Sequence, residues 1–590
     1  MRQSELGKSM RRVLLAASLA FPGIASAADA ITVGDVVIDP STVCCLGFSV
    51  PVSGDDNDNA VATIEYRATG TTTWREGLPL LRVRPELTSQ ETPPSTYGLS
   101  RPVEQFAGSV LRLSPGASYD IRIRVTDPDG GDRDQVVVAT TRSLPLDEPA
   151  TPRFVAVSDS AELDAALGAA APGDVIELAG GTYDSFTVSA DGTAENPIII
   201  RGASADAVTI DASGRTYGVT LSGEHIYLEH VTVTGSTWGA RSSNTTGTVI
   251  RYSRFLNIDR GIFAQSGTNR HFYICDNRLE GDFDWPTVGS VTFDAEGIVV
   301  SGQGHTICHN TLSGFGDALG LGNQTSIENV AIDFFGNDVL WTGDDGLELD
   351  FSHRNVRAFD NRITNANMGV SLQPVWGGPV YVVRNVFLNL AASAYKLNND
   401  PNGFYLYHNT SARTLGTGNW GDWAWTSLGY TQSGGYQAYA GNFEMKNNIL
   451  IGLGGPARVT TDLIRAEIDY NGWSPDGPFR FADVPWTDFA DLQATSPYEA
   501  NGRILDGQTF AAPLSLPANY MTFWSDIEVR LGASSPAIDA ALALPNINDG
   551  FEGAAPDLGA VEFGQALPAF GVRPEPDDVP PAKPTNVSVE

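Results

Sequence analysis

Positive charge is scarce in this 590-residue chain, which has 37 Lys and Arg residues against 70 Asp and Glu residues. Only four of the basic residues are lysines, namely Lys8, Lys396, Lys446 and Lys583. The formal net charge of −33 argues against a nucleic-acid-binding role, because such proteins need a basic surface to bind phosphates. Because Arg supplies most of the positive charge, a Lys on an acidic surface is a candidate for a specific role.

Cysteine is also rare. Four cysteines are too few for a disulfide-based scaffold, and no Cys and His spacing suggests a zinc site. Cys44 and Cys45 are adjacent, whereas Cys275 and Cys308 occupy equivalent positions of a repeat described below. In an oxidising compartment Cys275 and Cys308 could form a disulfide, and two stacked buried thiols are the alternative.

Long hydrophobic runs are absent, which argues against a membrane-spanning helix. The longest apolar run near the start, residues 13–21, falls short of the ~20 residues that a spanning helix needs. Basic residues precede it and Ala25-Ser26-Ala27 follows it, as in a secretory signal peptide. We therefore expect residues 1–27 to be a signal peptide and the protein to be secreted, periplasmic or attached to the cell surface.

Residues 31–147 alternate apolar and polar positions in short runs separated by Gly, Pro and Asp, which predicts an all-β sandwich. Near its end a turn leads into a strand in which Tyr119, Ile121 and Ile123 share one face, as in a tyrosine corner. With Ile64-Glu-Tyr-Arg67 and Trp74 upstream, this segment resembles a fibronectin type III domain. The resemblance implies a spacer or a module that presents substrate.

Residues 153–566 have a different sequence pattern, in which a helix is followed by a series of short strands. A short helix is expected at 161–171, and the sequences Gly173-Asp-Val-Ile-Glu-Leu178 and Gly180-Gly-Thr-Tyr183 follow it. This order resembles the capping segment of right-handed parallel β-helix proteins that act on polysaccharides. Residues 534–539 and 556–562 resemble the closing segment of such proteins, and 567–590 are expected to be a Pro-rich linker or the start of a further module.

A repeat supports the same fold. A recurring Asn follows a β-rich stretch, and three consecutive spacings are 24 residues; the positions are 257, 277, 310, 337, 361, 385, 409 and 448. Such a period with short β runs is typical of a solenoid. We therefore predict a right-handed parallel β-helix behind a β-sandwich, and we assign the Asn series to structure, because stacked Asn side chains can hydrogen-bond from coil to coil.

Aligning the coils predicts which side chains stack on the outside of the helix. One row contains Gly320, Glu348, Ser371 and Lys396, and a second row, two residues further along each strand, contains Gly322, Asp350, Gln373 and Asn398. Acidic residues come just before these rows at Asp317, Asp344 and Asp345. We expect the acidic residues to converge on one hard divalent cation, for which oxygen ligands without His or Cys indicate Ca²⁺.

Lys396 gives this acidic row a possible base, because a lysine can lose its proton when its surroundings lower its pKa. It could remove the proton at C5 of a uronate, next to the carboxyl group, and a cation would acidify that proton. The arrangement resembles the calcium site and lysine base of family 9 pectate lyases, with Glu348 where that family has Asp and with a more distant lysine. The resemblance implies Asp317, Asp344, Asp345 and Glu348 as ligands and Lys396 as base.

Other assignments stay open from the sequence. Chondroitinase-B-like and alginate lyases are similar at Glu348-Leu-Asp350, which adds Asp350 to the candidate ligands, and a polygalacturonase-like hydrolase could use the clustered Asp residues. The cluster could also be a structural ion or charge pair, or the chain could bind glycans without catalysis. Arg354 and Arg384 are alternative bases. Substrate contacts are predicted at Ser371, Gln373, Trp376, Asn398, Trp420 and Trp423. The Trp rings could stack on sugars if exposed, and they could equally form a small core of their own loops. We expect a monomer acting on an acidic polysaccharide.

Overall fold

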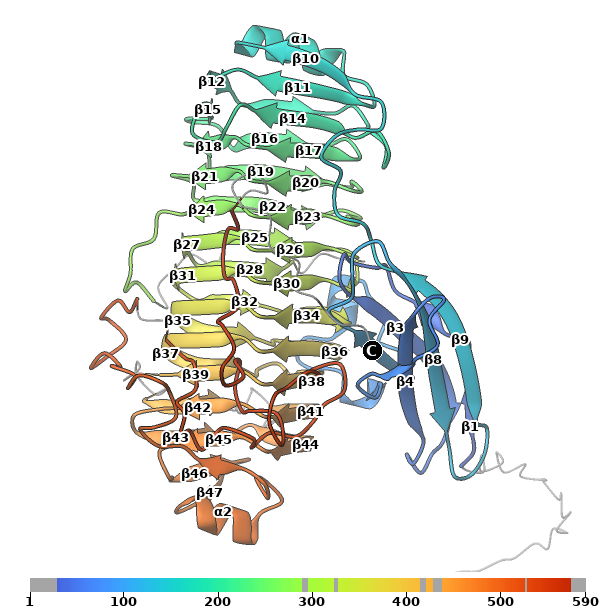
Figure 1. The fold of residues 1–590 in the computed structure, drawn as a ribbon, viewed down its shortest axis with the longest axis vertical. Helices are drawn as coiled ribbons and strands as arrows, with labels where there is room; N and C mark the ends of the chain where they lie inside the picture. Colours follow the sequence, from blue (N-terminus) through green and yellow to red (C-terminus); the bar gives the residue numbers. More distant parts are fainter. Residues whose placement is uncertain are drawn as a thin grey trace, which may run out of the picture.

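The computed structural model describes residues 29–288, 295–322, 327–413, 421–427, 438–525 and 528–574. The predicted signal peptide at residues 1–27 lies outside this range. Parallel strands stack into a long solenoid, and antiparallel sheets from the N-terminal part pack against one side of it (Figure 1). The predicted fold class, a parallel β-helix preceded by an antiparallel β unit, is confirmed.

The N-terminal part consists of two antiparallel sheets that share an apolar core including Phe48, Ile64 and Ile121. Tyr119 accepts a hydrogen bond from the backbone N–H of Ser114 at 3.0 Å, the geometry expected of a tyrosine corner. The strands of the first sheet are β1 (Ile31–Val33), β2 (Val37–Ile38), β3 (Leu46–Gly54), β6 (Leu81–Val83) and β7 (Gln105–Val110), and those of the second are β4 (Val61–Ala68), β5 (Arg75–Glu76), β8 (Ser118–Thr126) and β9 (Arg133–Thr140).

A short helix covers the start of the solenoid, as predicted. Helix α1 (Ser160–Gly168) begins after Asp159, whose side chain accepts from the backbone N–H of Glu162. Glu162 in turn accepts from the backbone N–H of Ser158, so the two ends of the first turn cap each other. Leu163 of this helix is buried in the solenoid core. A second helix near the other end, α2 (Phe489–Thr495), was not expected from the sequence.

One face of the solenoid is a parallel sheet of thirteen strands within the described residues. Each strand is short because the chain turns a corner after it, and buried side chains point inward along the whole stack. The strands are β10 (Arg153–Val157), β11 (Asp174–Leu178), β14 (Ile198–Gly202), β17 (Ile226–Glu229), β20 (Val249–Arg251), β23 (Tyr273–Cys275), β26 (Thr306–Cys308), β30 (Asp333–Phe335), β34 (Val356–Phe359), β36 (Trp376–Val383), β38 (Asn402–Tyr407), β41 (Tyr439–Lys446) and β44 (Asp462–Asp469).

A larger parallel sheet, from β12 (Gly181–Asp184) to β48 (Arg503–Ile504), forms the remaining faces of the coils. Its central strands hold the candidate site. They are β25 (Glu296–Val300), β27 (Thr311–Phe315), β28 (Asp317–Leu321), β31 (Asp338–Thr342), β32 (Asp345–Glu348), β35 (Arg362–Ser371) and β37 (Val386–Lys396).

The asparagine series is a structural ladder. The side chain of Asn361 donates to Asn385 at 2.9 Å, and Asn385 donates to Asn409 at 3.1 Å, so the repeat residues stack coil on coil as predicted. Two details differ from the prediction. Asn257 is exposed and stands outside the ladder, and Asn471, absent from the predicted series, extends the ladder past Asn448. The ladder runs through Asn277, Asn310, Asn337, Asn361, Asn385, Asn409, Asn448 and Asn471.

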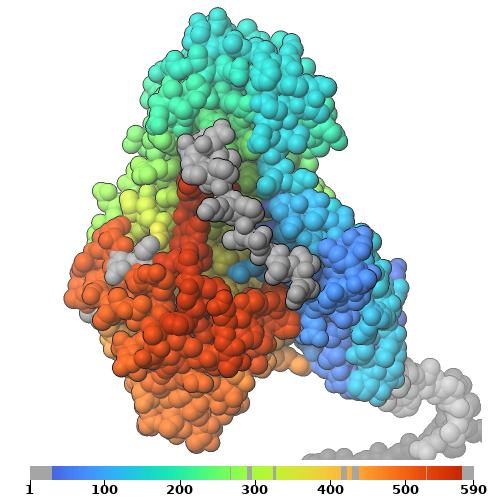
Figure 2. Space-filling view, in the orientation of Figure 1, coloured from blue at the N-terminus to red at the C-terminus, as the bar shows by residue number. Residues whose placement is uncertain are grey.

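The N-terminal sheets dock on the outer face of the thirteen-stranded sheet. The guanidinium of Arg354 binds Asp39 at 3.0 Å, and the hydroxyl of Ser109 donates to the side chain of Asn355 at 2.9 Å. Tyr381 on β36 accepts from the backbone N–H of Ser109. In the space-filling view these sheets (blue) lie directly against the coils (Figure 2). The solenoid and the N-terminal part are therefore joined by buried polar contacts.

The cysteines and the C-terminal segment complete the fold. Cys275 on β23 and Cys308 on β26 form a disulfide, which settles the choice that the sequence left open. After residue 528 the chain (red in Figures 1 and 2) returns along the outside of the coils. Arg573 ends this return by binding Asp276 at 2.6 Å. Among the described residues no helix is long and apolar enough to cross a membrane.

Candidate functional site

The register of the central strands is the one that the repeat predicts. Gly320 pairs with Glu348, Glu348 with Ser371, and Ser371 with Lys396, so these four residues occupy one position on successive coils. The second predicted row is also connected. Gln373 donates its backbone N–H to Asp350 at 2.6 Å and accepts from the side chain of Asn398 at 2.9 Å.

A sharp turn places the acidic residues at the start of β32. The backbone N–H of Asp344 donates to the carbonyl of Gly316 on the preceding coil at 2.8 Å, and β32 begins at the next residue. Gly346 follows within β32, and any side chain there would clash with Ile363 of β35, since a Cβ atom would lie 2.5 Å from its Cγ2. Asp317 is the first residue of β28, one coil earlier. Both coils therefore present carboxylates at the same point.

Asp317, Asp344 and Asp345 form a compact carboxylate cluster, in which one oxygen of each lies within 4.8 Å of the others. Asp317 is 7% exposed and Asp345 is 1% exposed. One oxygen of Asp317 accepts the backbone N–H of Asp345 at 3.0 Å. Among the described residues, Oδ1 of Asp345 has no hydrogen-bond partner. A buried carboxylate oxygen without a partner is costly, and a cation would satisfy it.

The pKa values of the cluster are those of carboxylates with too little positive charge beside them. Burial, together with the charges of Asp345 and Asp344, raises the pKa of Asp317 well above its usual value. Burial also raises the pKa of Asp345 to about 7, although Lys396 opposes the shift. These groups would therefore bind protons in place of a metal. The donor set consists of oxygen atoms alone, which suits a hard divalent cation.

Two further predicted ligands have different surroundings. Glu348 extends toward Gly320 on the previous coil, where a Cβ atom would lie 3.2 Å from its Oε2. Glu348 ends β32, the strand that begins at Asp345. Burial and the charge of Asp317 raise the pKa of Glu348 well above the usual range. Asp350 is held by the hydroxyl of Ser371 at 2.7 Å and by the backbone of Gln373, and burial raises its pKa to about 6. Asp350 therefore has partners of its own.

Lys396 points into the cluster. Its Nζ lies 3.0 Å from Oδ2 of Asp345, and its side chain is 17% exposed. Burial lowers its pKa, but the charges of Asp345, Asp350 and Asp344 raise it well above the usual value. This direction is opposite to the lowering predicted for a base, which needs a bound cation to neutralise these carboxylates. Lys396 is therefore protonated as long as the carboxylates beside it stay charged.

Three other predicted residues lie in structural contacts. Arg384 binds Glu562 of the returning C-terminal segment at 2.9 Å, and Arg354 binds Asp39 and Glu328. Neither arginine is free to act as an alternative base. Trp376 is 1% exposed, and its Nε1 donates to the carbonyl of Thr92 at 2.9 Å. The expectation of an exposed sugar-stacking ring at Trp376 is therefore wrong, because the N-terminal part covers it.

The remaining predicted contacts divide into two groups. Ser371, Gln373 and Asn398 stand together beside the cluster, although the Ser371 side chain is buried and bonded to Asp350. Trp423 starts β40 (Trp423–Ser427) and packs over Gly455, where a Cβ atom would lie 2.3 Å from its ring. Trp420 lies outside the described residues.

Two residues near the site were missed by the sequence argument. Asn367 on β35 donates its side-chain amide to Asp344 at 3.1 Å. Tyr97 comes from the N-terminal part, and its ring packs 5.2 Å from Phe351. Burial raises the pKa of Tyr97, and the charge of Asp350 adds to the rise. Asn367 follows from the coil register, whereas Tyr97 has no signal in the repeat.

The raised carboxylate pKa values predict an unusual pH dependence of stability without divalent cations. A carboxylate whose pKa rises on folding contributes stability that is complete below its unfolded pKa of about 4 and is lost as pH rises through its folded pKa. For Asp345 this loss spans pH 4 to about 7. We expect Asp345→Asn in chelator to gain stability relative to the wild type by about 2 to 4 kcal/mol between pH 5 and pH 8. Urea unfolding at each pH measures the difference, and a constant difference would contradict the prediction.

Comparison with known proteins gives distant structural likenesses. No protein-family model and no curated protein matches the chain. The pectate lyase Pel9A has 18% identity and a TM-score of 0.41, covering 70% of this chain and 97% of that one. The PL6 family alginate lyase AlyGC has 17% identity and a TM-score of 0.36 over 54% of this chain and 48% of that one.

A third likeness is to the family 28 exopolygalacturonase of Yersinia enterocolitica. It has 11% identity and a TM-score of 0.33, and the match covers 78% of this chain and 100% of that one. The match to the alginate lyase spans about half of that protein's length. All three likenesses are distant, since each identity is below 25% and each TM-score is below 0.5.

Proposed function

We propose that this protein is a secreted, Ca²⁺-dependent lyase that cleaves a uronate-containing polysaccharide by β-elimination. One observation carries the proposal. Lys396 Nζ lies 3.0 Å from Asp345, inside a cluster of three carboxylates in which one buried oxygen has no partner among the described residues. A lysine beside a cation-binding acidic cluster has the components needed to remove a proton next to a carboxylate.

The carboxylates suit a resident cation. Asp317, Asp344 and Asp345 would hold it, with Glu348 beside them. When bound, Ca²⁺ would neutralise the carboxylate of the uronate and make the adjacent C5 proton more acidic. Without compensation, the negative charge of this cluster would repel an acidic polymer.

Lys396 would act as the base. A cation that neutralised the carboxylates beside Lys396 would remove the charges that raise its pKa, so the amine could lose its proton. In the proposed step the unprotonated Nζ takes the proton from C5, and the electron pair of that bond forms the C4=C5 double bond. The bond from C4 to the glycosidic oxygen breaks, and the departing oxygen takes a proton from water. Neutral groups near Lys396 could position the sugar, since Gln373 and Asn398 form a hydrogen-bonded pair on the neighbouring row.

The geometry favours elimination over hydrolysis with inversion. An inverting hydrolase separates its two carboxyl groups by about 6.5 to 9.5 Å to leave room for water. One oxygen each of Asp317, Asp344 and Asp345 lies within 4.8 Å of the others, closer than that separation. Such close carboxylates suit one shared ion better than two separate roles with a water between them.

A screen of uronate polymers tests the proposal. Pectate, alginate, chondroitin and ulvan would each be incubated with the purified protein, with Ca²⁺ or with chelator. We expect one polymer to give unsaturated products that absorb ultraviolet light, and we expect chelator to stop their release. New reducing ends without unsaturation would indicate a hydrolase, and binding without any product would indicate a glycan-binding protein. Either result would contradict the lyase assignment.

A further inference from the structure

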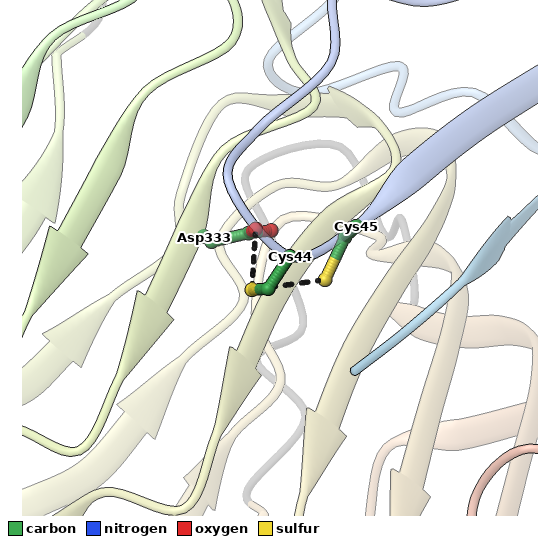
Figure 3. Close-up of side chains that lie close together, drawn as sticks. All are labelled: Cys44, Cys45 and Asp333. Atoms are coloured by element: carbon green, nitrogen blue, oxygen red, sulfur yellow. Dashed lines mark hydrogen bonds between the residues drawn. The ribbon is translucent and has the colours of Figure 1, made fainter. Parts of the chain in front are cut away.

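A second cluster of candidate ligands lies far from the acidic row, where the N-terminal part meets the solenoid. Cys44 and Cys45 come just before β3, and Asp333 begins β30 of the thirteen-stranded sheet. Figure 3 shows both sulfur atoms and the Asp333 carboxylate close together. One ligand atom from each residue lies within 4.8 Å of the others. Neither cysteine is in a disulfide.

The backbone brings the two thiols to the same side. Adjacent side chains in a regular strand point in opposite directions. Cys44 lies in a bend before β3, where Thr42 holds the turn by accepting the backbone N–H of Cys45 at 3.1 Å. The two sulfur atoms are consequently 3.6 Å apart. The turn thus produces a dithiol pair.

The distances match the edges of a tetrahedral metal site. Metal–sulfur bonds of about 2.3 Å and metal–oxygen bonds of about 2.0 Å give edges of about 3.8 Å between sulfurs and about 3.5 Å between sulfur and oxygen. The observed Sγ–Sγ distance is 3.6 Å, and Sγ of Cys44 lies 3.6 Å from Oδ2 of Asp333. Two of the three edges therefore match, and the third, between Cys45 and Asp333, is at most 4.8 Å.

Arg357 holds the Asp333 carboxylate by the oxygen that does not face Cys44. Its Oδ1 binds Nε of Arg357, and both side chains are fully buried. Its Oδ2 accepts the hydroxyl of Thr42 and faces Cys44. Metal-binding carboxylates are commonly oriented by such an outer partner. Arg357 thus holds the Asp333 oxygen toward the sulfurs.

Two buried polar atoms beside this carboxylate lack partners among the described residues. They are Nη2 of Arg357 and the hydroxyl of Thr306. Both residues flank Asp333 directly in the sheet register, and both are 0% exposed. Buried polar groups are rarely left unsatisfied. Their presence indicates that this polar pocket takes up an additional group, such as a metal-bound solvent molecule.

We propose that Cys44, Cys45 and Asp333 form a binding site for a thiophilic divalent cation of the Zn²⁺ type. On binding, each thiol releases one proton to solvent, and two thiolates and one carboxylate bind the ion. A solvent molecule completes four-coordination. The positive charge of Arg357 offsets the negative charge that the third anionic ligand adds. Thiolate ligands exclude Ca²⁺ from this site, so the two clusters bind different classes of metal.

The location gives this ion a structural role. The cysteines belong to the N-terminal part and Asp333 to the solenoid, so a bound ion ties the two together. An ion that binds the folded protein stabilises it according to its concentration and affinity. We therefore expect Zn²⁺ to raise the melting temperature of the full chain by several degrees, beyond any effect of Ca²⁺.

Co²⁺ titration of the reduced full-length protein tests the proposal. We expect a near-ultraviolet thiolate-to-cobalt charge-transfer band and the visible bands of tetrahedral Co²⁺, both removed by competing Zn²⁺. Cys44→Ser and Cys45→Ser should each abolish the charge-transfer band. Asp333→Asn removes a direct anionic ligand and should weaken Co²⁺ binding by more than the about 10- to 100-fold that loss of an outer partner costs. Thiol titration of the unfolded sample beforehand confirms that Cys44 and Cys45 are reduced.

A matched control separates metal binding from damage to the interface. Tyr381→Phe removes the hydroxyl that accepts from Ser109 in the same interface, and it leaves every proposed ligand in place. This variant should lose stability and keep the charge-transfer band. The proposal is overturned if the reduced wild type shows no such band, or if the two serine variants bind Co²⁺ as tightly as the wild type. Binding at the acidic cluster gives no thiolate band, so the two sites are distinguishable.

Discussion

Lys396→Ala is expected to reduce turnover of the correct polysaccharide by about 100- to 10,000-fold, the usual cost of losing a general acid or base. The residue lies inside the acidic cluster, with Nζ 3.0 Å from Asp345, and no other lysine occupies the coil rows at this site. Initial rates of unsaturated-product release, measured at saturating Ca²⁺, give the effect. Calorimetry should show that the variant still binds Ca²⁺.

Two companion variants sharpen this prediction. Lys396→Arg keeps the positive charge but cannot act as a base at working pH, so it should be almost as inactive as the alanine variant. Lys446→Ala is the matched control, because Lys446 is a buried lysine at the end of β41. It pairs with Glu444 on the same strand and with Glu467 on β44, outside the acidic cluster. The control should retain wild-type activity. An active Lys396→Arg variant would mean that Lys396 supplies charge and that another group removes the proton.

The coil repeat made much of this site predictable from the sequence. Each coil of a parallel β-helix adds one strand to the same sheet, so a fixed spacing between Asn residues determines which outward residues are neighbours. Glu348, Ser371 and Lys396 pair in the predicted register. The same logic predicted that Asp317 meets Asp344 and Asp345, even though the turn between β31 and β32 interrupts the strand pattern.

The protonation states of the site residues were less predictable. A pKa depends on burial and on every charge nearby, and the repeat gives positions without those quantities. Lys396 was expected to have a lowered pKa, but three carboxylates surround it and raise that pKa. The contacts of the N-terminal part were also unpredictable. Trp376 is covered by the segment around Thr92, which is 284 residues away in the sequence.

The site at Cys44 and Cys45 was also not predictable from the sequence. Metal sites that are recognised from sequence have ligands at short, regular spacings. Here the third ligand, Asp333, is 289 residues from Cys44 and belongs to a different part of the fold. The sequence therefore shows no zinc pattern, because the docking of the N-terminal part on the solenoid creates the site. Asp333 itself resembles any other acidic residue at the start of a strand.

Asp345→Asn is expected to weaken Ca²⁺ binding by more than the about 10- to 100-fold that loss of an outer partner costs, and to remove lyase activity at moderate Ca²⁺. Asp345 contributes the buried oxygen that has no partner among the described residues, and it also binds Lys396. The amide has the same shape but lacks the negative charge that a cation needs.

Asp338→Asn is the matched control, since Asp338 is a buried carboxylate on β31 that binds Arg362. Isothermal calorimetry should show unchanged Ca²⁺ affinity in the control. Equal Ca²⁺ affinity in wild type and Asp345→Asn would show that the acidic cluster is a charge network and no calcium site.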